Sequence, residues 1–254
     1  MVVWEGAVLL YAIIWGLAFW FIVSTYMAVL IPLYLLRALG RTREAWFYLG
    51  AISRIIARFL LFSTGTKLHI EGRENIPRDR PYCYIGNHQA YADILAMMAA
   101  APKAAGYIAK SSLKNLPIVR TWMILLGCYF LKRDSLKDGL KGILYGADRV
   151  KKGYPMVIFP EGHRSKGPEV KAFRKGGVKL ATKAKAWAVP VSIHGSYRLL
   201  EQKGYPQPTW IGVKFHPAID TAALTRAEED SLSDSLYDTI QKGVRDLQKL
   251  SPRR

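Results

Sequence analysis

The chain has few cysteines and few acidic residues. Cys83 and Cys128 are too few for a disulfide framework, and they lack the spacing of a zinc site. Each lies in an apolar run predicted to be a strand, so we expect two buried thiols in a reducing compartment. The 19 Asp and Glu residues are outnumbered by 37 Lys and Arg residues, which gives a net charge of +18. This balance indicates anionic partners, such as lipid head groups, phosphorylated substrates, nucleic acid or an acidic carrier protein.

Charge is also missing from Gly6 to Leu36, a run of 31 residues. About 20 apolar residues in a helix cross a bilayer, so the run is long enough to span one. It does not fit a cleaved signal peptide, because Glu5 stands where a basic region belongs and the apolar run is too long. A tilted span, a broken helix or a shallow re-entrant hairpin each fits this length. We therefore expect membrane attachment and leave spanning or dipping open.

Basic residues follow this run. If the run spans, the arginines within residues 37–43 place the rest of the chain on the cytoplasmic face of the inner (plasma) membrane. A second apolar segment, residues 46–65, carries Arg54 and Arg58 on one helical stripe. That pattern is typical of a helix that lies in the membrane interface or packs against the first segment. The alternative is an ordinary buried helix whose two arginines extend to solvent.

Beyond residue 65, short apolar runs alternate with helical patterns. Seven runs are predicted to be strands: residues 67–72, 82–86, 106–110, 128–132, 156–160, 189–195 and 210–216. Five segments are predicted to be helices: residues 93–101, 118–126, 135–152, 177–186 and 225–250. The alternation indicates an α/β fold with a mixed, largely parallel sheet flanked by helices. We predict an N-terminal membrane-attached helical element, residues 1–64, and one α/β domain, residues 65–254.

A histidine and an aspartate lie five residues apart in "YIGNHQAYADILAMM", residues 84–98. On a continuous helix His88 and Asp93 would be about 140° apart, and on a strand they would face opposite sides. A bend from strand into helix instead lets the carboxylate turn back and hold the imidazole, like the base and orienting acid of a catalytic triad. The alternative is that Asp93 only caps its helix and His88 is a solvated loop residue.

The sequence offers no nucleophile for this pair, because it has no G-x-S-x-G elbow. A histidine base can instead activate a hydroxyl that the substrate brings, which is worth roughly 10²–10⁴ in rate. A second polar turn follows a strand in "PMVIFPEGHRSKG", residues 155–167, where Gly162 and Arg164 suit a phosphate. Arg133, after the strand at residues 128–132, adds a second cation. Ligands gather at the carboxyl ends of strands, so we expect these segments to meet at one edge of the sheet.

Four segments occur in the order of the motifs of a known family. They are N-H-x-x-x-x-D from Asn87 to Asp93, "FLKR" ending in Arg133, "FPEGHRS" at 159–165 and "VPVSIHGS" at 189–196. Together they resemble the four motifs of the glycerolipid acyltransferases, most closely the bacterial 1-acyl-sn-glycerol-3-phosphate acyltransferases. The first and third motifs are specific in combination, whereas the second and fourth are weak alone.

The resemblance implies a reaction. His88, oriented by Asp93, would deprotonate the sn-2 hydroxyl of 1-acylglycerol 3-phosphate (lysophosphatidic acid) for attack on an acyl thioester, giving phosphatidic acid. The residues that would bind this acceptor are Lys110, Arg133, Glu161, Gly162 and Arg164. The fourth motif, around Pro190, would help line the acyl-donor side. No metal or bound cofactor is implied, since acyl-CoA or an acidic acyl carrier protein acts as co-substrate. The implied partners are these substrates and the phospholipid bilayer, and not nucleic acid.

Two positions depart from the commonest motifs: Ala90 replaces a serine, and His163 replaces a threonine. They bear on acceptor preference, so glycerol 3-phosphate or another lysophospholipid stays an alternative acceptor. A different alternative is a hydrolase whose metal ion is held by the residues His88, Asp93, Glu161 and His163, although their spacing matches no zinc motif. A non-enzymatic protein that binds membranes or nucleic acid through the basic residues 164–185 is a third, and it leaves the His–Asp pair without a task.

Overall fold

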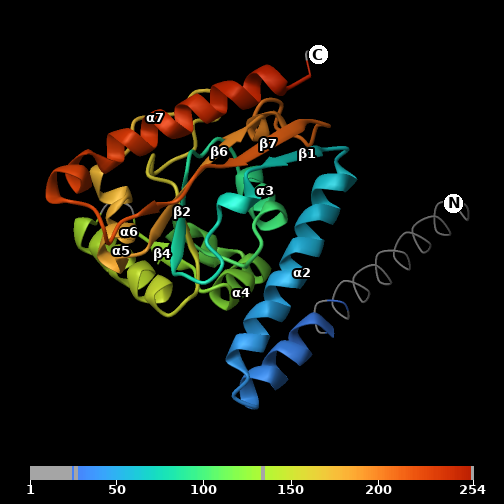
Figure 1. The fold of residues 1–254 in the computed structure, drawn as a ribbon. Coiled ribbons are helices and arrows are strands. Elements are labelled where there is room, and N and C mark those ends of the chain that lie inside the picture. Colours follow the sequence, from blue (N-terminus) through green and yellow to red (C-terminus); the bar gives the residue numbers. More distant parts are fainter. Residues whose placement is uncertain (1–24, 26–27, 133–134, 253–254) are drawn as a thin grey trace, which may run out of the picture. The chain divides into compact units, whose positions relative to one another are not determined.

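The computed structural model describes residues 25, 28–132 and 135–252 (Figure 1). The chain forms two compact units, residues 1–52 and 53–254. Of the first unit, the described part holds a short apolar helix, Ala28–Ala38, and the beginning of helix α2, Thr42–Ser63. Most of the apolar run from Gly6 to Leu36 lies outside the described residues, as does Arg133.

Helix α2 confirms the helix predicted at residues 46–65 and begins four residues earlier. Within the described residues it is the one helix long and apolar enough to cross a membrane, a test that buried core helices also pass. Its part in the second unit exposes the large side chains of Phe59 and Phe62. Arg54 is partly exposed, and its guanidinium donates a hydrogen bond to the carbonyl oxygen of Ala101 at 3.0 Å. The helix therefore combines an exposed apolar face with an arginine that binds the protein itself.

The second unit contains one eight-stranded sheet in the order β1-β7-β6-β2-β5-β3-β4, with β8 beside β6 (Figure 1). The strands are β1 Lys67–Glu71, β2 Tyr82–Gly86, β3 Gly106–Lys110, β4 Tyr129–Leu131, β5 Met156–Ile158, β6 Trp187–His194, β7 Trp210–Phe215 and β8 Ile219–Asp220. β6 is antiparallel to β7 and β8, and the other pairs are parallel. The predicted mixed, largely parallel sheet is thus confirmed, and only the two-residue β8 was not predicted.

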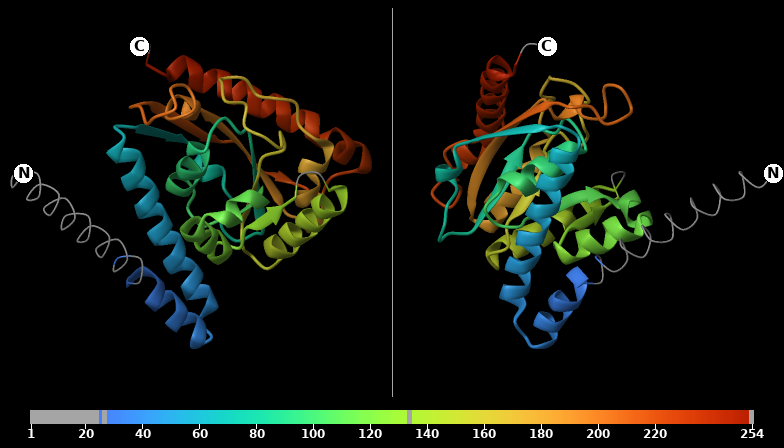
Figure 2. Two further views of the ribbon diagram at one scale, coloured as in Figure 1. Left: turned by 180° about the vertical axis from the view of Figure 1, so that it is seen from behind. Right: turned by 90° about the vertical axis from the view of Figure 1, so that its right-hand side faces the viewer.

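Helices flank this sheet, as predicted. They are α3 Ala92–Ala100, α4 Pro117–Leu125, α5 Leu136–Lys151, α6 Lys179–Ala184 and α7 Arg226–Leu250. Buried side chains of α5, α6 and α7 pack against β2, β5 and β6 in one hydrophobic core, and Figure 2 shows α7 lying along the sheet. Thr225 and Glu228 form a capping box that begins α7. Both ends of these five helices agree with the predicted ends to within two residues.

Both cysteines are buried free thiols, as predicted. Burial raises the pKa of each thiol to about 12, so neither is a ready nucleophile at neutral pH. Cys83 lies in β2, whereas Cys128 precedes β4 by one residue. The five strands β6, β2, β5, β3 and β4 all run in one direction, so their carboxyl ends meet at one edge of the sheet. The loops that follow β2, β5 and β6 leave from that edge.

Candidate active site

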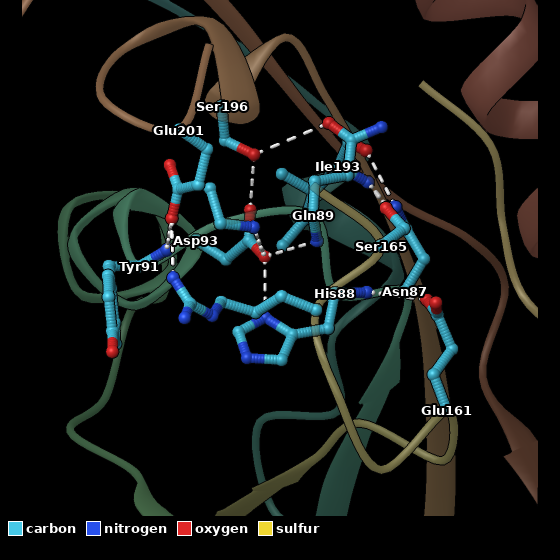
Figure 3. Close-up of polar contacts among 12 residues, drawn as sticks. Asn87, His88, Gln89, Tyr91, Asp93, Glu161, Ser165, Ile193, Ser196 and Glu201 are labelled. Carbon is cyan, nitrogen blue, oxygen red and sulfur yellow. Dashed lines mark hydrogen bonds and ion pairs between the residues drawn. The ribbon is translucent and has the colours of Figure 1, made fainter. Parts of the chain in front are cut away.

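His88 and Asp93 form a close pair in the bend between β2 and α3 (Figure 3). The imidazole Nδ1 lies 2.6 Å from the Asp93 Oδ2. The Asp93 side chain is fully buried, and 14% of the His88 side chain is exposed. The ring of Phe159, the first residue after β5, stacks on the imidazole with centroids 4.2 Å apart. The carboxylate thus turns back to the imidazole as the spacing predicted, and His88 is not a solvated loop residue.

The Asp93 carboxylate is surrounded by donors. Its Oδ2 also accepts hydrogen bonds from the backbone N–H groups of Gln89 at 2.7 Å and Ala90 at 2.9 Å. Its Oδ1 accepts one from the hydroxyl of Ser196, which follows β6. These amides precede the helix, so Asp93 binds the loop and does not cap α3. An acceptor-only carboxylate requires the proton on Nδ1 of His88, which leaves the lone pair on Nε2.

A second buried carboxylate, Glu161, holds His88 by its main chain. Its Oε1 accepts a hydrogen bond from the His88 N–H at 2.7 Å, and its Oε2 accepts one from the Lys171 N–H at 3.1 Å. Burial, which disfavours the charged form, raises the pKa of Glu161 to about 7, and the nearby Asp93 adds to the increase. Both oxygens therefore engage backbone amides, which is the geometry of a residue that positions His88.

Backbone and side-chain amides join the three loops at this sheet edge. The Ser165 N–H, in the loop after β5, donates to the carbonyl oxygen of His88 at 2.8 Å. The side chain of Asn87 exchanges two hydrogen bonds with the main chain of Ile193 in β6, both at 2.8 Å. Because Asn87 is fully buried, these bonds are shielded from water and fix the start of the His88 loop to β6.

Arg164 lies beside the same loop and is held by a residue that no motif predicted. Its Nη1 donates to the Glu201 Oε1 at 2.8 Å, and its guanidinium carbon lies 3.5 Å from the centroid of the Tyr91 ring. The same Glu201 oxygen accepts a hydrogen bond from the Tyr91 N–H at 2.8 Å. The side chain of Glu201 is 5% exposed and that of Arg164 is 22% exposed. A nearly buried acid therefore ties the arginine of the third motif to the loop of the first.

Three other predicted site residues, Gly162, Lys110 and Pro190, lie in different surroundings. Gly162 has a φ of +75°, and a Cβ there would lie 3.0 Å from the Arg174 guanidinium, so the turn favours glycine. Lys110 ends β3 at the same sheet edge and is exposed. Pro190 is buried within β6, opposite Ile85 of β2. The residue of the fourth motif that reaches the histidine pair is Ser196.

The metal-hydrolase alternative finds no support in the arrangement of side chains. In the part of the chain that the structure describes, no group of three or more His, Cys, Asp or Glu residues could hold a metal ion. Of the residues considered for such a site, Glu161 directs both oxygens to backbone amides. Among the residues that the structure describes, no metal-ligand set therefore surrounds the His88–Asp93 pair.

A histidine–aspartate pair at the carboxyl edge of an α/β sheet suits general-base catalysis, and comparison with known proteins identifies the family. Residues 67–194 match the Acyltransferase family. The 1-acyl-sn-glycerol-3-phosphate acyltransferase of Borreliella burgdorferi is 27% identical over 74% of this chain and 76% of its own length. The chloroplastic acyltransferase LPAT1 of Arabidopsis thaliana is 32% identical over 53% of this chain and 38% of its own length.

A solved structure extends the likeness to nearly the whole chain. The crystal structure of the 1-acyl-sn-glycerophosphate (LPA) acyltransferase from Thermotoga maritima has a TM-score of 0.77 and 28% identity, covering 91% of this chain and 94% of that one. The chain belongs to the acyltransferase family and is an enzyme that transfers acyl groups.

Proposed function

We propose that this enzyme is a 1-acyl-sn-glycerol-3-phosphate acyltransferase. It transfers a fatty acyl group from acyl-CoA or acyl carrier protein to the sn-2 hydroxyl of lysophosphatidic acid, giving phosphatidic acid and a free thiol. The observation that carries the proposal is the His88–Asp93 pair, in which the buried Asp93 binds Nδ1 of the imidazole and leaves Nε2 unused. The names of the relatives support the choice of acceptor.

The proposed chemistry uses His88 as general base. Nε2 takes the proton of the acceptor hydroxyl as the oxygen attacks the thioester carbonyl carbon, and Asp93 stabilises the imidazolium that forms. The tetrahedral intermediate then collapses with cleavage of the C–S bond. The proton on Nε2 passes to the leaving sulfur, which restores the neutral imidazole and releases the thiol. No acyl group is attached to the protein at any stage.

Arg164 binds the acceptor phosphate in this proposal, with Gly162, Lys110 and Arg133. The guanidinium has five N–H donors, and the bond to Glu201 uses one, so others are left for phosphate oxygens. Glu201 acts as a positioning residue that holds the Arg164 guanidinium in place. Glu161, which binds the His88 amide, has a positioning role rather than a direct contact with the acceptor.

The N-terminal part is proposed to attach the enzyme to the membrane. We infer that residues 1–64 form a membrane-attached element and that residues 65–254 form the catalytic domain on the cytoplasmic face. The uncharged run from Gly6 to Leu36 and the arginines within residues 37–43 support this placement. A membrane location suits the reaction because the acceptor and the product both reside in the bilayer.

A thiol-release assay on the purified chain tests the function. Acyl-CoA and acyl carrier protein serve as donors, and lysophosphatidic acid, glycerol 3-phosphate and lysophosphatidylcholine serve as acceptors. We expect thiol release to depend on lysophosphatidic acid and to match the phosphatidic acid formed. Faster release with glycerol 3-phosphate or lysophosphatidylcholine would change the assigned acceptor. Release at the same rate without any acceptor would show a thioesterase and overturn the proposal.

A further inference from the structure

Helix α5 exposes three leucines and has small residues at most of its buried positions. Leu136, Leu140 and Leu144 are 97%, 55% and 51% exposed, and their spacing of four residues puts them on one stripe. The buried positions of the helix are instead Gly142, Gly146, Ala147 and Val150. A surface helix normally turns its leucines to the core. The reversed pattern indicates that the outward face has a partner of its own.

Close packing prevents the helix from rotating to bury these leucines. A Cβ added at Gly146 would lie 2.3 Å from the Leu180 Cδ1 in α6, and one added at Gly142 would lie 3.0 Å from the Tyr129 ring in β4. A leucine turned inward would meet the same neighbours with a larger side chain. The packing of the inward face therefore keeps the three leucines on the surface.

The stripe carries positive charge beside its leucines. Lys137 and Lys141 follow the first two leucines and are exposed. The one acidic residue in these first two turns, Asp138, accepts hydrogen bonds from the Tyr129 hydroxyl at 2.8 Å and the Lys132 N–H at 2.6 Å. An apolar stripe edged by lysines matches an anionic bilayer surface, where leucines enter the acyl boundary and ammonium groups meet the head groups.

The stripe also begins where the proposed substrate must arrive. β4 ends at Leu131 and α5 begins at Leu136, so the first turn of the helix lies at the sheet edge that carries the His88 loop. We propose that the outward face of α5, defined by Leu136, Leu140 and Leu144 with Lys137 and Lys141, docks on the anionic bilayer from which lysophosphatidic acid enters. The inference rests on the proposed function for its lipid substrate.

Vesicle binding tests this surface with a matched control. Leu140→Glu alters the stripe, and Leu250→Glu alters a leucine of equal exposure, 55%, at the end of α7. The full chain is sedimented with vesicles of phosphatidylcholine and phosphatidylglycerol, and with phosphatidylcholine alone. We expect Leu140→Glu to weaken partitioning to the anionic vesicles about tenfold, and Leu250→Glu to bind as the parent does. Thermal unfolding of both variants checks that the fold is kept.

Activity gives a second readout. We expect Leu140→Glu to lower the rate with vesicle-borne lysophosphatidic acid relative to the rate with a water-soluble short-chain acceptor. Lys137→Ala with Lys141→Ala should reduce the difference between anionic and neutral vesicles. Equal vesicle binding by Leu140→Glu and Leu250→Glu would overturn the inference. Conversion of a parent dimer to a monomer, with vesicle binding unchanged, would overturn it in favour of a contact between two copies.

The two proposals fail in different ways. A parent enzyme that binds vesicles but acylates no lysophosphatidic acid refutes the proposed function. The α5 surface is still tested by comparing vesicle binding of Leu140→Glu and Leu250→Glu. A parent that acylates lysophosphatidic acid, with a Leu140→Glu variant that binds vesicles normally, refutes the α5 surface alone.

Discussion

Two histidine–carboxylate pairs in the described part of the second unit have similar contact distances. The His69 Nε2 lies 2.8 Å from the Glu71 Oε1, and the His88 Nδ1 lies 2.6 Å from the Asp93 Oδ2. Each imidazole also stacks on an aromatic side chain. Distance and stacking therefore do not distinguish the pair on β1 from the pair after β2.

The surroundings of the carboxylates distinguish them. The side chain of Glu71 is 31% exposed and forms an ion pair with Lys214 at 3.3 Å. The hydrogen bond from His69 lowers the pKa of Glu71. Asp93 is fully buried among amide and hydroxyl donors that hold it in one orientation. The first pair lies within strand β1, and the second lies in the bend between β2 and α3. The proposed catalytic pair thus differs from the other in its buried acid, which accepts several hydrogen bonds, more than in the length of the His–carboxylate contact.

The largest expected loss of activity distinguishes substitution of His88 from substitution of His69. His88→Ala removes the proposed base, and we expect kcat for lysophosphatidic acid acylation to fall by about 10³ or more. His69→Ala is the matched control and should change kcat less than about twofold. Thiol release by both purified variants measures the difference. Similar losses in both would show that the two pairs are not functionally distinct.

The next effect separates the two acids. Asp93→Asn puts an NH₂ group among donors that need acceptors, and it removes the charge that stabilises the imidazolium, so we expect a loss of about 10²–10³ in kcat. Glu71→Gln is the control, with activity close to that of the parent. Far-ultraviolet circular dichroism should show both variants folded. Retention of full activity by Asp93→Asn would remove the orienting role.

How well the sequence predicted these features depends on how local each one is. Strand and helix periodicity placed seven strands and five helices, and a five-residue spacing at a bend predicted the His88–Asp93 contact. β8 is two residues long, too short for any period to indicate it. Ser196 lies 103 residues from Asp93, and Glu201 lies 110 residues from Tyr91, so these partners depend on strand order, which a single sequence does not reveal. Ser196 had a weak signal, because it ends the fourth motif, whereas Glu201 had none.

A smaller effect tests the Glu201 contact. Glu201→Ala frees the Arg164 fork, and we expect KM for lysophosphatidic acid to rise about tenfold with kcat within about threefold. Glu201→Gln keeps an acceptor oxygen for Arg164 and the Tyr91 amide, so it should recover part of the lost affinity. Glu169→Gln, at an exposed position of the loop after β5, serves as control. A fall in kcat with KM unchanged would place Glu201 elsewhere in the mechanism.

The smallest effect on activity is expected for Glu161. For this residue the predicted change is in the pH dependence of stability. Its folded pKa of about 7 lies above the ordinary value of 4.5, so its contribution to stability is full below about pH 4.5 and is lost as the pH rises through 7. The loss amounts to roughly 3 kcal/mol between these limits. The midpoint temperature of thermal unfolding should fall more from pH 5 to pH 8 for the parent than for Glu161→Gln. Equal declines would show that Glu161 does not titrate in this range.

The most direct measurement of the central claim is a rapid-mixing experiment with the acyl-CoA donor alone. If His88 acts only as a base on the acceptor hydroxyl, no thiol is released in the first turnover until lysophosphatidic acid is added, and intact-protein mass spectrometry finds no acylated enzyme. A burst of about one thiol per enzyme before the acceptor is added, with an acyl group on the protein, would contradict the account.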